Sequence, residues 1–316
     1  MSEERFEQAR RALDAHDVER LRALLDADPA LVGARGGTNR NDLLGMAAAT
    51  RDERLVTLLL ERGADPAAAN VHGWTALHQA AYVGLPALAA LLLDAGAPAR
   101  GEARGAGGTP LVVALFWGHA TTAELLAARA GRAPGSLRVA AGLGDLALIE
   151  QLWPVGGEPS AAAGAARAFH RPHTGFPAWT PADDPQEIVD EALAWAARND
   201  RADALDPLVA RGARLDADVY RGSALAWAAA CGALGALDRL LALGADPNGR
   251  GSFGGLEHGE GVSALHLAAQ DGRIEAIERL LAAGADRTIR DALHGLTAAE
   301  WARYGRHDGA VALLGG

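Results

Sequence analysis

Residues 77–84 read Leu-His-Gln-Ala-Ala-Tyr-Val-Gly, and this stretch decides the fold. Its leucine is followed by small residues at plus three and plus four and by glycine at plus seven. That spacing predicts a short helix with one closely packed face, ended by a residue that tolerates positive φ. Similar stretches occur at 111–118, 225–232 and 265–272, the first with leucine at plus four. Self-similarity of this kind predicts a stack of repeated units.

Weaker copies extend the same register to nine anchor positions, spaced by 35, 33, 34, 26, 56, 32, 40 and 34 residues. Four of the anchors are followed by a second apolar stretch that ends in a leucine pair and then Gly-Ala. The glycines of these four Gly-Ala pairs, Gly63, Gly96, Gly244 and Gly284, are predicted helix C-caps. The anchors are Ala9, Leu44, Leu77, Leu111, Leu137, Leu193, Leu225, Leu265 and Ala299.

Two segments carry a more specific pattern. Residues 73–81 (Gly-Trp-Thr-Ala-Leu-His-Gln-Ala-Ala) and 261–269 (Gly-Val-Ser-Ala-Leu-His-Leu-Ala-Ala) resemble the Gly-x-Thr-Pro-Leu-His-x-Ala-Ala core of the ankyrin repeat family. The resemblance covers nearly the whole chain. It implies an all-α solenoid in which each repeat has two antiparallel helices and a hairpin, with a concave groove lined by first helices and hairpin tips. It also implies that His78 and His266 hydrogen-bond between turns.

The predicted organisation is a single solenoid with a repeat-like cap at each end. We expect an N-terminal cap at 1–33, repeats at 34–155 and 185–290, an insertion at 156–184, and a C-terminal cap at 291–316. A single repeat cannot bury its apolar face alone, so stability must come from neighbouring repeats.

Composition excludes several function classes. The formal net charge is -10, which argues against nucleic acid or an anionic membrane as a partner. No apolar run approaches the roughly 20 residues that span a bilayer, and the first residues resemble neither a signal nor a transit peptide. We therefore expect a cytoplasmic monomer. The chain has no lysine, which excludes a Schiff base and a P-loop, and we predict neither a cofactor nor a metal.

The long insertion departs most from the repeat pattern. Residues 160–167 are rich in alanine and predict a short helix, and the aromatic and proline residues that follow predict an ordered loop. His170 and His173 are expected on one side of extended backbone, because proline disfavours helix at the residue before it. They could bind a metal or an anion, act as acid and base, or simply hydrogen-bond the loop to the solenoid. The metal is disfavoured because no third ligand is in register.

The second departure, residues 250–261, is predicted to enlarge one hairpin. It contains Phe253, His258 and Glu260, which a plain hairpin would not need. Both excess segments enter on the side where hairpins emerge, so together they could overhang the groove and narrow it into a small-molecule pocket. The acid, base or ligand candidates for such a pocket are His170, His173, His258, Glu260 and Asp184.

Groove positions follow from the family resemblance, which places the two residues after each Ala-Ala pair in the concavity. An aromatic amino-terminal half (Tyr82, Phe116, Trp117) is then either an exposed binding surface or the floor of the insertion. Trp195, Trp227 and Trp301, each two residues after an anchor, are predicted to pack in the core. Cys231 is predicted to be a small buried residue and not a nucleophile.

Two functions remain open from the sequence. The favoured one is a non-enzymatic module that binds a protein partner through the groove and hairpin tips. The alternative is a small-molecule site under the two excess segments, with histidine-based acid-base catalysis. The predicted binding residues are Tyr82, Phe116, Trp117, Phe169, His170, Arg171, His173, Trp179, Arg198, Asn199, Tyr220, Phe253, His258, Glu260, Gln270 and Asp271.

Overall fold

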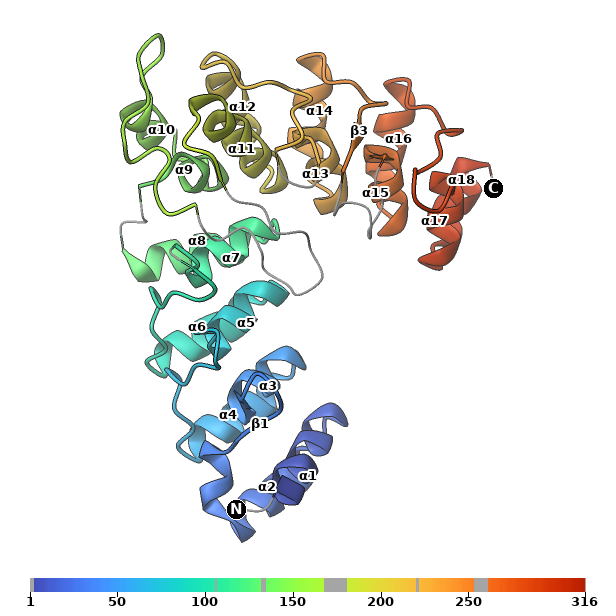
Figure 1. Ribbon diagram of the computed structural model, residues 1–316. Helices are drawn as coiled ribbons and strands as arrows, with labels where there is room; N and C mark the ends of the chain where they lie inside the picture. Colours follow the sequence, from blue (N-terminus) through green and yellow to red (C-terminus); the bar gives the residue numbers. More distant parts are fainter. Residues whose placement is uncertain are drawn as a thin grey trace. The chain divides into compact units, whose positions relative to one another are not determined.

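The protein is a succession of short helix pairs (Figure 1). This computed structural model describes residues 3–105, 107–131, 135–167, 181–219, 222–252 and 261–315. The chain falls into two compact units. Unit 1 comprises Met1–Ala114 and Thr121–Ala133, and unit 2 comprises Leu115–Ala120 and Pro134–Gly316.

Unit 1 contains four helix pairs and one β-hairpin. The helix α7 begins in unit 1, and its last two residues group with unit 2. A 3-10 helix, η1 (Pro29–Gly33), and the antiparallel strands β1 (Arg35–Gly36) and β2 (Asn41–Asp42) connect the first two pairs. The helices are α1 (Glu3–Asp14), α2 (Val18–Ala27), α3 (Leu43–Ala49), α4 (Glu53–Glu61), α5 (Ala76–Val83), α6 (Pro86–Asp94), α7 (Pro110–Phe116) and α8 (Ala120–Ala130).

The described residues of unit 2 form five helix pairs and a second hairpin. The strands β3 (Arg250–Gly251) and β4 (Val262–Ser263) pair antiparallel and are separated in the sequence by residues 252–261. The helices are α9 (Leu137–Leu143), α10 (Leu146–Leu152), α11 (Pro185–Arg198), α12 (Ala202–Val209), α13 (Ala224–Cys231), α14 (Leu234–Ala242), α15 (Ala264–Gln270), α16 (Ile274–Ala282), α17 (Ala298–Tyr304) and α18 (Asp308–Leu314).

Each predicted anchor lies in an odd-numbered helix, the first of its pair. Side-chain caps fix where several of these helices begin: Thr75 accepts from the His78 amide at α5, and Thr297 accepts from the Glu300 amide at α17. The four predicted C-cap glycines have φ between 85 and 96°. The all-α fold expected from the sequence is therefore confirmed.

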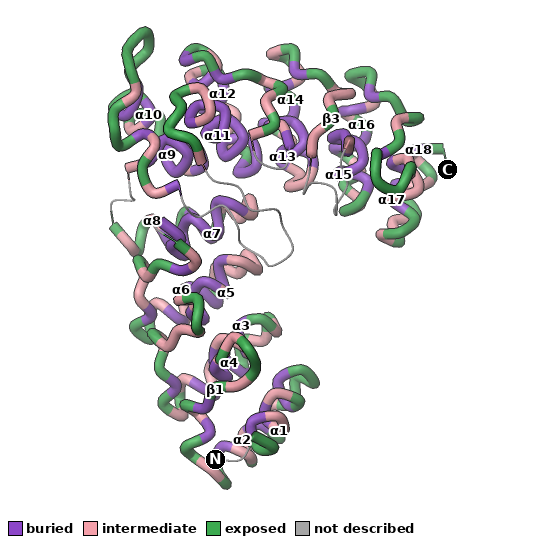
Figure 2. The backbone as a smooth tube through the Cα atoms, viewed as in Figure 1, coloured by how far each residue is buried: buried purple, intermediate pink, exposed green. Residues whose placement is uncertain are grey.

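The core follows from the repeat pattern. Leu77, Ala80 and Ala81 are fully buried on one face of α5, and each strong copy buries its equivalents. In unit 2 a large cluster of buried hydrophobic side chains extends from Leu137 to Leu314, and Ala226, Val262 and Leu267 form a second, small cluster. Figure 2 shows the buried residues along the helices and the exposed residues mainly in the turns between them. Each buried leucine contributes about 1.5 to 3 kcal/mol, which is how neighbouring repeats stabilise one another.

One local prediction is wrong. Residues 160–167 form turns and not a helix. Ala163 is buried, and its carbonyl accepts from the Leu137 amide, which ties the segment to the start of α9. A Cβ on Gly164 would lie 2.7 Å from Cδ1 of Ile188, so the turn depends on a close approach to α11. Tertiary contacts thus override the helix propensity of alanine.

Candidate functional site

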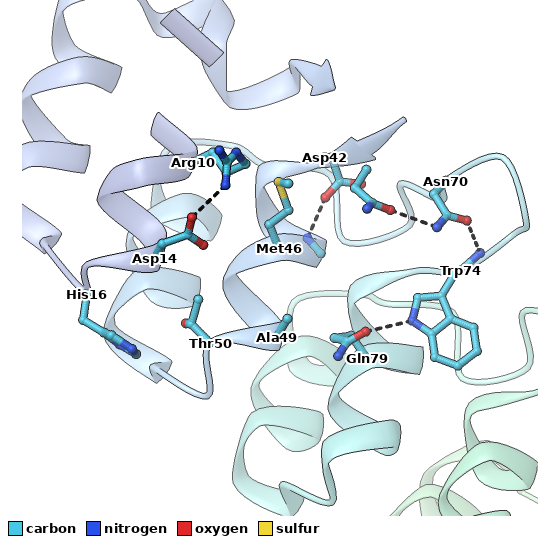
Figure 3. Close-up of a pocket in the computed structure, with 12 residues that line it drawn as sticks. Arg10, Asp14, His16, Asp42, Met46, Ala49, Thr50, Asn70, Trp74 and Gln79 are labelled. Carbon is cyan, nitrogen blue, oxygen red and sulfur yellow. Dashed lines mark hydrogen bonds and ion pairs between the residues drawn. The ribbon is translucent and has the colours of Figure 1, made fainter. Parts of the chain in front are cut away.

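A pocket of about 510 Å³ lies on unit 1 (Figure 3). Three first helices, α1, α3 and α5, line it together with the β2 strand and the turn at residues 70–74. Its lining includes the half-buried side chains of Met46 and Trp74. The pocket therefore combines apolar surface with polar side chains, three of which are carboxamides: Asn41, Asn70 and Gln79.

Hydrogen bonds fix the polar side chains of this pocket. The Trp74 indole Nε1 donates to Oε1 of Gln79 over 3.1 Å, and Nδ2 of Asn70 donates to Oδ1 of Asn41 over 2.9 Å. Oδ1 of Asn70 in turn accepts from the Trp74 backbone amide. The side-chain oxygens of Gln79 and Asn41 each accept one of these hydrogen bonds. Their NH₂ groups make no hydrogen bond to another described residue and can therefore donate to a ligand.

The charges around the pocket are largely paired within unit 1. Nη1 of Arg10 donates to Asp14 over 2.8 Å, and Nε donates to Glu7. The buried Asp42 carboxylate caps α3 by accepting from the Gly45 amide over 2.7 Å, and burial raises its pKa. The pocket thus offers neutral hydrogen-bond donors and acceptors rather than one strong charge.

A second, smaller pocket of about 300 Å³ lies on unit 2. Trp301 and Tyr304 of α17 line it, with Gln270 from the end of α15 and His294 and Leu296 from the preceding loop. Tyr304 is 92% exposed, and Trp301 is half-buried. Two aromatic side chains therefore face solvent at the last helix pair.

Two buried histidines connect neighbouring repeats. His78 Nδ1 contacts Thr75 Oγ1 at 2.8 Å, and its Nε2 lies 3.1 Å from the Gly101 and Gly108 carbonyls. His266 repeats the arrangement with Ser263 and the Leu296 carbonyl. Burial lowers the pKa of His78 to about 4, so the imidazole is neutral at pH 7. The predicted bonding between turns is confirmed.

Comparison with protein families agrees with this architecture. A model of ankyrin repeats in three copies matches residues 12–101 and 43–134, and a single ankyrin repeat model matches residues 260–292. The chain is an ankyrin-repeat protein. A search of curated proteins finds no match. Ankyrin repeats are generally protein-protein interaction modules.

The aromatic residues predicted for the amino-terminal half of the groove differ in exposure. In this ankyrin-repeat protein Tyr82 is half-buried, and its ring lies 6.5 Å from that of Trp74 in an edge-on arrangement. Trp117 is also half-buried, but Phe116 is only 2% exposed. Phe116 packs edge-on against Trp195 and Trp227, so it belongs to the core and offers no exposed binding surface.

Arg198 and Asn199, which were predicted as binding residues, are buried instead. The Arg198 guanidinium lies 3.8 Å above the Trp227 ring and donates to the Phe116 carbonyl over 2.7 Å. Asn199 Nδ2 donates to the Leu115 carbonyl over 2.8 Å. These two side chains therefore hold the segment Leu115–Ala120 against α11. The sequence prediction failed because it placed them by repeat position alone.

The tryptophan row is partly as predicted. Trp195 and Trp227 are buried, as expected, but Trp301 is half-exposed. Met46 and Gln79, at the same repeat position, line the pocket of unit 1. This position is thus a core position only where a neighbouring side chain covers it. Gln270 lines the pocket of unit 2, and Asp271 beside it is exposed.

A buried ionic cluster joins the two described ends of the insertion. Arg167 donates to Glu191 Oε2, to Glu187 Oε1 and to the Ala182 carbonyl, at 2.5 to 2.7 Å. Arg138 donates to the other Glu191 oxygen over 2.9 Å. Two arginines thus face two glutamates, and residues 167 and 182 are held together. No local sequence signal marks this cluster, because its members come from separate parts of the chain.

Most of the predicted catalytic candidates lie outside the described residues. Asp184 is described: it caps α11 by accepting from the Gln186 amide. Cys231 is half-buried and burial raises its pKa to about 11, in line with a non-nucleophilic thiol. The residues outside the description are Phe169, His170, Arg171, His173, Trp179, Tyr220, Phe253, His258 and Glu260.

Among the described residues, no group of three or more histidine, cysteine, aspartate or glutamate side chains is arranged to hold a metal ion. None of the helices in the described part combines the length and apolar character that crossing a membrane requires.

Proposed function

We propose that this ankyrin-repeat protein binds a protein partner, and that the pocket of unit 1 receives an extended segment of that partner. The observation that carries the proposal is the pocket of about 510 Å³ lined by α1, α3 and α5 and by the adjoining hairpin turns. Those are the first-helix and hairpin surfaces that the family resemblance assigns to binding.

The pocket chemistry suits a peptide backbone. The oriented NH₂ groups of Gln79 and Asn41 can donate to carbonyl oxygens, which every residue of an extended peptide presents. Met46 and Trp74 add apolar surface of the kind that anchors a partner side chain. Because the Arg10 guanidinium is paired with two carboxylates, Glu7 and Asp14, it does not select an acidic segment.

Peptide selection on the full chain tests this proposal. Random dodecapeptides displayed on phage would be selected against the immobilised protein, and the enriched peptide synthesised and its Kd measured. We expect Met46→Ala and Gln79→Ala each to weaken binding by about fivefold or more, as for residues near the centre of an interface.

Matched variants separate a local effect from a general one. Leu146→Ala removes a side chain that is 44% exposed in unit 2, and Gln8→Ala removes an amide on α1 outside the pocket. Both should bind the peptide like the wild type. A selected peptide that responds equally to all four variants would contradict the proposed site.

The alternative of a small-molecule pocket with histidine chemistry stays a prediction. Its candidates His170, His173, His258 and Glu260 lie outside the described residues, and Asp184 is engaged in capping α11. No observation on the described residues favours it over protein binding.

A further inference from the structure

Trp301 and Tyr304 form an aromatic corner on unit 2. They are three residues apart in α17, so their side chains share one helix face, and both line the pocket of about 300 Å³. The Trp301 indole is fixed because Nε1 donates to Oδ2 of Asp291 over 3.0 Å. That carboxylate also accepts from the backbone amides of His294 and Leu296.

Two tryptophans of unit 2 at the equivalent repeat position each have an arginine guanidinium group over the ring. Trp195 and Trp227 stand two residues after their anchors, as Trp301 does. The Arg138 guanidinium lies 4.6 Å from the centre of the Trp195 ring, and that of Arg198 lies 3.8 Å from the centre of the Trp227 ring. Within the described residues no arginine lies over Trp301, although its ring has the same place in the repeat.

We infer that the corner formed by Trp301 and Tyr304 binds the cationic side chain of an arginine or lysine from a protein partner. The tryptophan face attracts a cation through the ring quadrupole. The anionic hydrogen-bond partner at Nε1 increases the electron density of the indole, which strengthens that attraction. The Asp291 carboxylate is thus the part of the site that selects a positive charge, although it does not touch the ligand.

Gln270, which also lines this pocket, offers it a hydrogen-bond acceptor. The Gln270 side chain reaches the pocket and has no hydrogen bond to another described residue, so its oxygen can accept from a guanidinium or ammonium. Arg303 is two residues from Trp301, about 200° around α17, and so lies on another helix face. The net charge of -10 also favours a basic partner segment.

This second site is independent of the pocket on unit 1. It extends the proposed protein-binding role, and it is tested with a probe peptide that is not expected to contact Met46 or Gln79. The probe is the blocked pentapeptide acetyl-Gly-Gly-Arg-Gly-Gly-amide, compared with the peptide in which neutral citrulline replaces arginine. Citrulline keeps the shape of the side chain, but a carbonyl oxygen replaces one guanidinium NH₂ and the positive charge is lost.

The measurement is a titration of the ¹⁵N-labelled full chain followed by NMR. The Trp301 indole resonance is assigned by its loss in Trp301→Phe. We expect the arginine peptide to shift this resonance in a saturable manner and the citrulline peptide to bind about 2- to 30-fold more weakly. Equal binding of the two peptides, or saturation without a shift at Trp301, would overturn the inference.

Two variants complete the test. Tyr304→Ala should weaken binding of the arginine peptide. It should leave the melting temperature of the protein unchanged, because this side chain is 92% exposed. Gln79→Ala, in unit 1, should leave the titration unchanged. Unaltered affinity of Tyr304→Ala would contradict the proposed corner, whereas loss of binding only in Gln79→Ala would place the peptide in the other pocket.

Discussion

Gly118 is fixed by both its backbone conformation and its neighbours. Its φ is +72°, and a Cβ there would lie 2.5 Å from the Arg198 carbonyl oxygen and 2.7 Å from Sγ of Cys231. Gly212 has a similarly positive φ of +93° but no heavy atom within 4 Å of its Cβ position. Comparing alanine substitutions at these two glycines therefore distinguishes the cost of backbone strain from the cost of steric overlap.

Gly118→Ala should destabilise the protein more than Gly212→Ala. Both substitutions incur about 1 to 2 kcal/mol for the left-handed backbone, and Gly118→Ala adds about 1 to 3 kcal/mol of overpacking. Urea denaturation of the two variants measures the difference. Equal free energies of unfolding would show that the segment 115–120 relaxes without loss.

His78 makes the stability depend on pH. Burial lowers its pKa from the ordinary 6.5 to about 4, so between these values the unfolded chain binds more protons than the folded one. The contribution of the neutral imidazole to the free energy of unfolding is fully present above pH 6.5 and is lost as the pH falls towards 4. The total loss is about 3 kcal/mol. The advantage of wild type over His78→Gln in free energy of unfolding should shrink by that amount from pH 7 to 4.

Gln8→Ala supplies the control, because the side chain that it removes does not titrate. The difference between wild type and Gln8→Ala should stay constant over the same range. A constant difference for His78→Gln as well would contradict a buried neutral imidazole.

At the scale of elements, the insertion is held at its ends. Arg167, which ends the turns at residues 160–167, donates to the Ala182 carbonyl and to Glu187 and Glu191 of α11. Arg138 of α9 also donates to Glu191. A buried ion pair is weak evidence for net stability, but removing one partner leaves the other charge uncompensated. The cluster is therefore a sensitive point of unit 2.

Glu191→Gln should lower the free energy of unfolding by about 3 to 5 kcal/mol, because two buried guanidinium groups then face one carboxylate. Glu278→Gln, an exposed change on α16, should stay within about 0.5 kcal/mol of the wild type. Denaturant unfolding compares them. A loss for Glu191→Gln no larger than that of the control would show that the charges are solvated.

Elements were predictable from sequence to the extent that their signals are local. Leu77, Ala80 and Gly84 encode the face and the end of α5 within eight residues, and the same signal recurs along the chain. Positions such as Arg198 and Phe116 were misplaced because their burial depends on partners in other repeats. The unit 1 pocket was not foreseen for the same reason: nothing in the repeat register distinguishes Met46 and Gln79 from the buried tryptophans at the same position, and only tertiary packing leaves them uncovered.

At the scale of the whole molecule, stability should be a sum over neighbouring helix pairs. In unit 2, α17 packs on α15 and α18 packs on α16. The last pair buries Ala298, Ala302, Ala310 and Leu314, and the Leu296 carbonyl before it bonds to His266. The end pair therefore covers the apolar faces of α15 and α16, although Trp301 and Tyr304 leave part of its own surface open.

Deletion of residues 291–316 should consequently lower both the midpoint and the m-value of urea unfolding. The midpoint falls because an interface and the His266 bond are lost, and the m-value falls because less surface is buried in the folded state. Tyr304→Ala should change neither quantity, since this ring is 92% exposed. If the truncated chain unfolds at the wild-type midpoint, coupling between neighbouring pairs is too weak to be the source of stability, and each pair must be stable by itself.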